Sequence, residues 1–346
     1  MTELKRNSYF DTTKFILIFL VVFGHFLESK MGHSLICNEL HAFIYLFHMP
    51  LFIFISGYFS HRSDKKKFWQ SEGRLLETLV VFHVGSLVYK LTVNQTLGLN
   101  DLVIPGFGSW YLLSLICWKA ILQILPEKWL NPLPLVMASL AISLLGGFVP
   151  IGGAFSVQRT LSLFPFFVIG HIVRKKKCLN GIKLNKLVGG GILLLILLTY
   201  ILLRNAFAND DQYLQILDTC SRIEQATYCY SKWGNPMMWL MGRLIFIIVS
   251  SVMCVSILSI VPETRIPLIS DEGKDSLVYY VYHAFVFRLL LKAYPIIGLD
   301  YNLVTLFVGA IIVMTIIYVI KHIPIFVNAL NPISLIIKRK EIVNKK

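Results

Sequence analysis

Ten apolar segments separated by short polar connections constrain this chain more than any other feature of its sequence. Most of them have the roughly 20 residues that a helix needs to cross a bilayer. They cover about residues 12–29, 42–60, 75–93, 108–125, 133–150, 160–174, 185–204, 237–260, 277–295 and 302–322. Only 15% of the residues are charged, whereas soluble domains carry about a quarter. We therefore predict an all-α fold, a polytopic membrane bundle of about ten transmembrane helices.

The basic residues lie in runs between these segments, and this arrangement predicts the topology. The runs are Arg62 with Lys65, Lys66 and Lys67, then Arg174 with Lys175, Lys176 and Lys177, and finally Lys338, Arg339, Lys340, Lys345 and Lys346. With a cytoplasmic N-terminus every run falls on the cytoplasmic side, as the positive-inside rule requires. We therefore expect both termini in the cytoplasm. The net charge of +14 then reflects topology and anionic lipid rather than nucleic acid, which we do not expect as a partner.

The chain is expected to form a single membrane domain over residues 1–346, with a core at about 8–322 and a basic cytoplasmic tail at about 323–346. The first apolar segment ends in FGHFLESK, without the small-residue site at which signal peptides are cleaved. We therefore expect it to be retained, in a multi-pass protein of the inner (cytoplasmic) cell membrane.

The longest non-cytoplasmic connection covers about residues 205–236 and supports two readings. It is a solvated loop with interfacial aromatic residues, or a lid over a sugar acceptor. Cys220 and Cys229 lie close together in this loop, and we predict that they form a disulfide. No cysteine and histidine spacing indicates a metal site.

Lys14 and His25 are the most informative polar residues, because both stand within the first apolar segment. Eleven helical steps of about 100° return to within roughly 20° of the starting direction, so the two side chains share one face about 16 Å apart. Titratable groups at membrane depth are costly and indicate a functional site. His48, counted from the opposite end of the second segment, reaches nearly the depth of His25. We therefore predict that these two histidines face each other.

For each further candidate residue, a structural role is an alternative to a functional one. Ser56 and Gly57 permit close backbone approach or serve helix packing, and Arg74 binds phosphate or anchors the third segment. Trp110 and Tyr111 are expected at the outer interface, where belt aromatics occur. Arg159 lies at the outer start of the sixth segment, where the positive-inside rule disfavours basic residues. His283 is expected at a membrane depth nearer to that of Lys14 than to that of His25.

These residues occur in motifs that resemble acyltransferase family 3, a family of integral-membrane acyltransferases. The motifs include Asp11 and Lys14 followed by FGH at His25, then HMPLFIFISGY, GRLL at Arg74, Trp110-Tyr111-Leu112, FPFFVIGHIVRKK and VYYVYHAF at His283. Their order over about residues 8–290 is that of the family. The HMPLFIFISGYF wording is most similar to the branch of fucose 4-O-acetylases and related polysaccharide O-acetyltransferases.

The resemblance implies that acyl-CoA, binding from the cytoplasm, donates an acetyl group to a hydroxyl of a surface polysaccharide or its lipid-linked sugar precursor. The family's basic residue, usually arginine, is Lys14 here. Lysine keeps the positive charge but lacks the planar guanidinium that forms two parallel hydrogen bonds. The family's basic residue and histidine, ten residues apart, fall on Lys14 and His25, and we predict these two residues and His48, for its depth, as catalytic residues. Donor or substrate binding falls to Asp11, Ser56, Gly57, Arg74, Trp110, Tyr111, Arg159 and His283.

The residues alone suit this chemistry, because a sugar hydroxyl needs a general base and imidazole serves near neutral pH. His25 either activates the hydroxyl or carries the acyl group transiently. Acetyl-CoA is expected as a substrate and not as a resident cofactor, and the expected partners are the glycan acceptor, membrane lipids and a second copy or an envelope protein. The competing interpretations are a transporter or flippase of glycan intermediates and a membrane protein without turnover.

Overall fold

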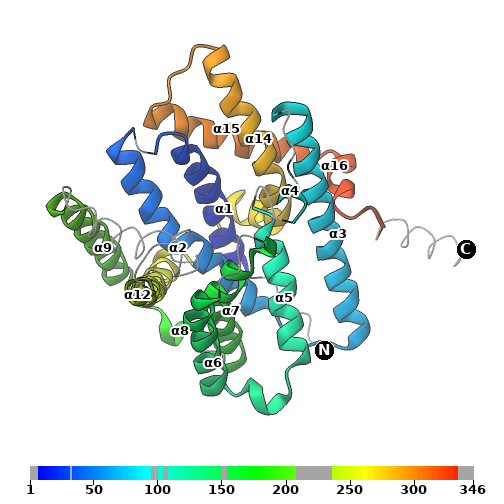
Figure 1. The fold of residues 1–346 in the computed structure, drawn as a ribbon, viewed down its shortest axis with the longest axis vertical. Helices are drawn as coiled ribbons and strands as arrows, with labels where there is room; N and C mark the ends of the chain where they lie inside the picture. The colour runs from blue at the N-terminus through cyan, green and yellow to red at the C-terminus, as the bar shows by residue number, and fades with distance from the viewer. Residues whose placement is uncertain are drawn as a thin grey trace, which may run out of the picture.

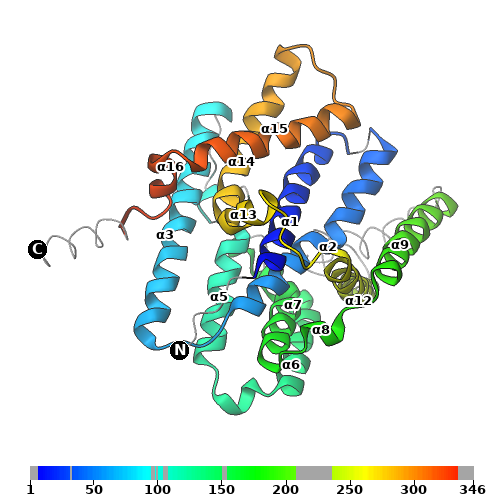
Figure 2. The ribbon, with the colours of Figure 1, turned by 180° about the vertical axis from the view of Figure 1, so that it is seen from behind.

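A computed structural model describes residues 7–31, 33–94, 98, 100–103, 108–149, 154–207 and 236–333. Throughout these ranges the regular structure is helical (Figures 1 and 2). The long helices are α1 (Ser8–Glu28), α2 (Leu35–Phe59), α3 (Lys65–Tyr89), α5 (Trp110–Ile124), α6 (Pro132–Leu145), α7 (Val157–Lys176), α9 (Lys186–Ala206), α12 (Pro236–Ile260), α14 (Ser276–Ile296) and α15 (Leu303–Lys321).

Short helical segments connect the long helices. They are η1 (Lys90–Asn94), α4 (Asn100–Val103), η2 (Glu127–Leu130), η3 (Gly146–Phe148), η4 (Ala154–Ser156), α8 (Leu179–Ile182), α13 (Ile269–Glu272), η6 (Gly273–Asp275) and α16 (Pro324–Ala329). A helix thus lies at each of the ten predicted apolar segments, which confirms a helical bundle.

Length and composition support membrane crossing for some of the long helices. Six helices of the described chain are long and apolar enough to span a bilayer, namely those at Ser8–Glu28, Leu35–Phe59, Lys65–Val93, Lys186–Ala206, Pro236–Ile260 and Leu303–Lys321. Two more apolar helices, at Trp110–Ile124 and Pro132–Phe148, are shorter. Ten crossings and cytoplasmic termini stay predictions, since both ends of the chain lie outside the described residues. Cys220, Cys229 and most of their loop lie outside them as well.

The bundle has a buried centre and a lipid-like rim. Most side chains of α1 and α2 are buried, whereas α9 buries only Gly189 and Tyr200 and packs chiefly on α12. Figures 1 and 2 show α9 at the edge of the molecule beside α12. Leucines cover its outer surface, with Leu187, Leu195 and Leu202 among the most exposed. An apolar helix with an exposed apolar face is what a lipid-facing position requires.

Glycines fix the approach of the central helices. A Cβ atom at Gly57 would lie 1.9 Å from the Phe167 carbonyl oxygen, and one at Gly170 would lie 2.0 Å from that of Phe54. These reciprocal contacts lock α2 onto α7, the most extensive pairing between the described helices. Helices approach this closely only through small residues. Gly57 is therefore a packing residue at the α2–α7 crossing.

The turn α13–η6 ties the start of α14 to α1. A Cβ atom at Gly273 would lie 1.8 Å from the Asp11 carbonyl oxygen, and the hydroxyls of Thr12 and Ser270 are 2.7 Å apart. Lys321 at the end of α15 pairs with Glu272 at 2.5 Å. These contacts hold α14 alongside α1 and α15. The sequence places Lys14 and His25 on α1, so this packing determines which residues of α14 face them.

Candidate functional site

A polar cluster around His25 lies at the C-terminal end of α1. His25 Nδ1 is 3.1 Å from Glu28 Oε2, one helical turn further on. The Tyr45 hydroxyl, from α2, donates a hydrogen bond to Glu28 Oε1 and lies 3.4 Å from His25 Nδ1. His41 Nε2 is 3.6 Å from Glu28 Oε1. Together with His283, described next, these residues form what we call the histidine cluster.

His283 stacks on His25 from the neighbouring helix α14. The two ring centroids are 5.5 Å apart and the rings are 15° from parallel. Only 1% of the His283 surface is exposed. Its Nδ1 lies 3.2 Å from the Tyr279 carbonyl, and its buried Nε2 has no hydrogen-bond partner within the described chain. Because Nδ1 must donate to that carbonyl, Nε2 presents a lone pair.

This arrangement corrects two expectations from the sequence. His283 lies beside His25 and not nearer the level of Lys14, because the α13–η6 turn sets the start of α14 against Asp11. The histidine stacked on His25 is His283, not His48. The His48 ring packs on that of Tyr45 at 4.5 Å, and its Nδ1 bonds to the Ile44 carbonyl at 2.8 Å. Segment length predicts depth, but the rotation of each helix decides which side chains meet.

The contacts of His25 suit a general base. The Glu28 carboxylate can only accept, so Nδ1 of His25 carries the proton between them and Nε2 holds the lone pair. A base whose second nitrogen is oriented by a carboxylate is the arrangement of catalytic triads. Sequence analysis missed Glu28, although its position three residues after His25, in GHFLE, gave a signal: such residues share a helix face.

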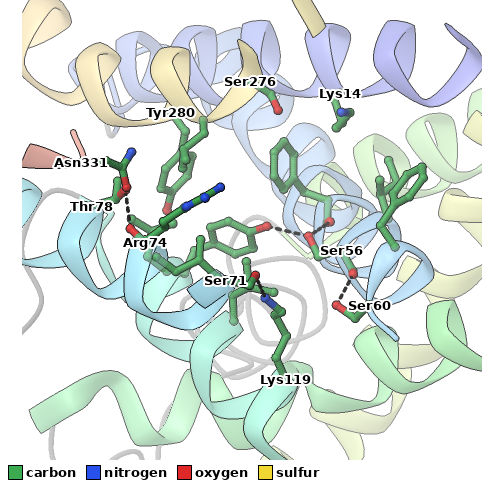
Figure 3. Close-up of a pocket in the computed structure, with 18 of the residues that line it drawn as sticks. Lys14, Ser56, Ser60, Ser71, Arg74, Thr78, Lys119, Ser276, Tyr280 and Asn331 are labelled. Carbon is green, nitrogen blue, oxygen red and sulfur yellow. Dashed lines mark hydrogen bonds between the residues drawn. The ribbon is translucent and has the colours of Figure 1, made fainter. Parts of the chain in front are cut away.

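A cavity of about 660 Å³ lies between α1, α2, α3, α5 and α14, and we call it the first cavity (Figure 3). Four predicted residues line it: Lys14, Ser56, Arg74 and Tyr111. Figure 3 shows Arg74 reaching from α3 into the open space below Tyr280 and Ser276. Lys67 and Lys119 also line the wall. The sequence did not single out Lys119, because its position in α5 looks like an ordinary interfacial lysine.

Carboxylates hold two of these cations in place. Lys14 Nζ is 2.7 Å from Asp11 Oδ1, and Asp11 is 5% exposed. Lys119 pairs closely with the buried carboxylate of Glu72 and lies 3.0 Å from the Ser71 hydroxyl. Asp11 thus positions Lys14 from outside the cavity wall. Both lysines are ordered before any ligand arrives, and this lowers the entropy cost of binding an anion.

Tyr111 closes one side of the first cavity. Ser56 donates to the Phe52 carbonyl at 2.9 Å, so the Tyr111 hydroxyl donates to Ser56 Oγ at 2.6 Å. Only 4% of Tyr111 is exposed. The expectation that Tyr111 belongs to an outer aromatic belt is therefore wrong. The short helix α5 starts inside the protein, where Gly108 accepts a hydrogen bond from the Tyr280 hydroxyl.

Trp110 and Arg159 lie together next to this wall. Trp110 is 8% exposed, so it too is buried rather than interfacial. The Arg159 guanidinium lies 5.3 Å from the centre of the Trp110 ring, a cation–π contact. Arg159 is also within electrostatic range of Tyr280. Neither Arg159, Trp110 nor the packing residue Gly57 belongs to the cavity lining.

Tyr280 joins the first cavity to the histidine cluster. It lines the cavity, and its ring centre is 5.7 Å from that of His283. The first cavity therefore ends one side chain, that of Tyr280, away from the paired histidines. Within the described ranges, no group of three or more histidine, cysteine or acidic residues is arranged to hold a metal ion.

Comparisons with known proteins agree with the motifs of the sequence. Residues 7–322 match the model of acyltransferase family 3, described as "Acyltransferase domain". A curated relative is the Nodulation protein NolL of Mesorhizobium japonicum (strain LMG 29417 / CECT 9101 / MAFF 303099), 29% identical over 184 residues. That match covers 48% of this chain and 48% of NolL, so the chain spans about half the length of this relative. No solved structure matches the chain.

Proposed function

The chain belongs to acyltransferase family 3, and on that premise we propose that it is an acyl-CoA-dependent O-acyltransferase. It moves an acetyl group to a hydroxyl of a surface polysaccharide or of its lipid-linked sugar precursor. The protein acts in the inner cell membrane, with the first cavity open to the cytoplasm.

One observation carries the proposal: a cationic cavity ends one side chain away from a pair of stacked histidines. Coenzyme A is a phosphate-bearing anion with a long arm that ends in the thioester. Lys14, Arg74 and Lys119 supply positive charge where the phosphates would lie, and arginine binds phosphate through two parallel hydrogen bonds. The arm then reaches past Tyr280 toward His25.

The transfer step follows from the contacts of His25. Its Nε2 takes the proton of the sugar hydroxyl while the oxygen attacks the thioester carbonyl, forming a tetrahedral intermediate. The C–S bond then breaks, and the departing thiolate takes the proton from the imidazolium. Glu28, fixed by Tyr45, stabilises the positive charge that His25 carries between these events.

Direct transfer is preferred here over an acyl-imidazole carrier because of the second histidine. His283 is stacked against His25 and is almost wholly buried. The thioester and the hydroxyl would therefore meet at an edge of the His25 ring that His283 does not cover. In direct transfer both substrates must be bound before either product leaves, whereas a covalent carrier releases CoA first. Initial-rate kinetics with varied donor and acceptor separate the two: intersecting lines support direct transfer, and parallel lines support the carrier.

The proposal is tested with purified protein in lipid nanodiscs. Acetyl-CoA is supplied with glycans and lipid-linked sugars extracted from cells that lack the protein, and free thiol and acetyl esters are measured together. We expect equal amounts of both, and at least about a hundredfold less of each with His25→Ala. NMR of surface glycans from cells with and without the protein should show a matching difference in O-acetyl groups. Glycan translocation without any thiol release would reject the acyltransferase in favour of a flippase.

A further inference from the structure

A second cavity lies at the opposite ends of α3 and α14 from the first. Its volume is about 440 Å³, and among the described residues it is lined by Tyr89, Arg288, Leu291, Lys292, Pro295 and Tyr301. On α14, Ser276, Leu277 and Tyr280 line the first cavity, whereas this lining starts at Arg288. On α3, residues 67–78 belong to the first cavity and Tyr89 to the second. The histidine cluster lies between the two.

Two cations of α14 stand one turn apart in this cavity. Arg288 donates to the Ala284 carbonyl at 2.6 Å, and its guanidinium lies 4.6 Å from the Phe287 ring centre. Lys292 Nζ lies 3.3 Å from the Val93 carbonyl oxygen and 5.9 Å from the Tyr89 ring centre. These contacts hold both cations against the cavity wall.

A third cation approaches from α1. Lys30 Nζ is 5.5 Å from the ring centre of Tyr301, which itself lines the cavity. By the predicted topology this end of the molecule is non-cytoplasmic, where basic residues are disfavoured. Three basic residues around two tyrosines at that end therefore indicate a binding role, because topology gives no reason for them.

Arg288 also connects this cavity to the histidine cluster. It follows His283 by five residues on one helix, a rise of about 7.5 Å. The Glu28 carboxylate that orients His25 acts electrostatically on Arg288. Arg288 therefore lies about one and a half helical turns beyond His283, in the direction away from the first cavity.

We propose that the second cavity is the acceptor site and that Arg288 and Lys292 bind a phosphate group of a membrane-anchored sugar acceptor. This inference rests on the function proposed above and narrows its acceptor to a lipid-linked sugar phosphate. Lys292 lies only four residues before the end of α14, about 6 Å along the axis. That is the depth at which the phosphate of an anchored lipid meets the bilayer surface. The sugar then extends inward toward His25.

The test reads occupancy of the cavity and not turnover, so it stands even if the transferase assay fails. Protein carrying Leu291→Cys is placed in phosphatidylcholine nanodiscs, and the rate at which the introduced thiol reacts with a maleimide is followed by site-resolved mass spectrometry. The probes are glucose 1-phosphate and, as its uncharged match, glucose. We expect glucose 1-phosphate to slow labelling and glucose at the same concentration to leave it unchanged.

Charge-removing variants complete the test. Adding Arg288→Gln should raise the glucose 1-phosphate concentration needed for protection by about tenfold or more, since hydrogen bonds between charged groups are worth that much. Arg288→Lys should restore part of the protection. Arg265→Gln, a matched change at an exposed arginine outside both cavities, should change nothing. The thermal unfolding midpoint in nanodiscs should be equal in all these proteins, which shows that they are folded.

Three results would overturn the inference. Equal protection by glucose and glucose 1-phosphate would mean that the cavity does not recognise phosphate. Full protection by glucose 1-phosphate in the Arg288→Gln protein would show that Arg288 does not bind the phosphate. Protection by phosphatidylglycerol in the nanodisc, with no further effect of glucose 1-phosphate, would identify the cavity as a site for ordinary lipid headgroups.

Discussion

The two cavities differ in how their positive charges are held. In the first, Lys14 and Lys119 are paired with the carboxylates of Asp11 and Glu72. In the second, Arg288 and Lys292 are oriented by neutral carbonyls and aromatic rings. The first is also the larger, at about 660 Å³ against 440 Å³.

This difference suggests two kinds of anion binding. Carboxylates fix the lysines of the first cavity but cancel part of their charge, so discrimination there depends on shape and hydrogen bonds as well as on charge. The second cavity is smaller, and two of its lining residues, Arg288 and Lys292, are basic. A large ligand with several phosphates suits the first cavity, and a single phosphate suits the second. Variants between the cavities should then affect both substrates, and variants within one cavity should affect one.

The largest effect is expected for His25→Ala, because we propose His25 as the general base of the transfer. Loss of a general base typically costs about 10²–10⁴-fold in rate, and we expect kcat to fall by that factor while acetyl-CoA binding persists. His322→Ala is the matched control, since His322 is at the exposed end of α15 and outside both cavities. A His25→Ala protein with near-normal turnover would move the catalytic role to His283.

Glu28→Gln should have the next largest effect. The amide keeps the size of the side chain but cannot stabilise an imidazolium. We therefore expect kcat to fall by up to the roughly 10⁴-fold that the equivalent change costs in a catalytic triad, with both KM values little changed. Glu28→Asp should recover part of the rate, because the charge remains. The check is steady-state kinetics with each substrate varied in turn. If KM for acetyl-CoA rises and kcat is unaffected, Glu28 is a donor-binding residue and not a positioning residue.

Arg74→Ala should act on the donor alone. Losing a charged hydrogen bond to phosphate is worth about 1.5–3 kcal/mol, which corresponds to a rise of about 10–100-fold in KM for acetyl-CoA. The acceptor KM should stay the same, and Arg74→Lys should be intermediate because lysine lacks the bidentate fork. A parallel rise in both KM values would show that the two cavities are not separate sites.

The smallest effect is expected for substitutions of Ser56 and Tyr111 in the wall of the first cavity. Ser56→Ala removes the acceptor of the Tyr111 hydrogen bond, a neutral contact worth about 1 kcal/mol, so KM for acetyl-CoA should rise about fivefold. Tyr111→Phe should have a similar effect, and the double variant should be no worse than either single one, since both remove the same bond. Additive effects would mean that each hydroxyl contacts the donor independently.

Particular residues show how far the sequence could predict the site. Lys14, Arg74, Ser56 and Tyr111 were predicted and do line one cavity, because chemically unusual residues in apolar segments identify themselves. Glu28, Lys119 and Arg288 were missed. Glu28 ends its helix, where a solvated role is the ordinary interpretation. Lys119 and Arg288 lie within helices that the sequence predicts, and only their neighbours in space indicate what they do.

The sequence by itself determined the helical membrane fold, the helix positions and the shared face of Lys14 and His25. These properties depend on hydrophobic length and on the fixed rise and rotation of a helix, which are local. Only the tertiary structure decided that His283 stacks on His25, that Trp110 and Tyr111 are buried, and that Gly57 packs against α7. Depth, tilt and rotation of one helix against another depend on contacts between distant residues, such as Gly57 with Phe167 and Gly273 with Asp11.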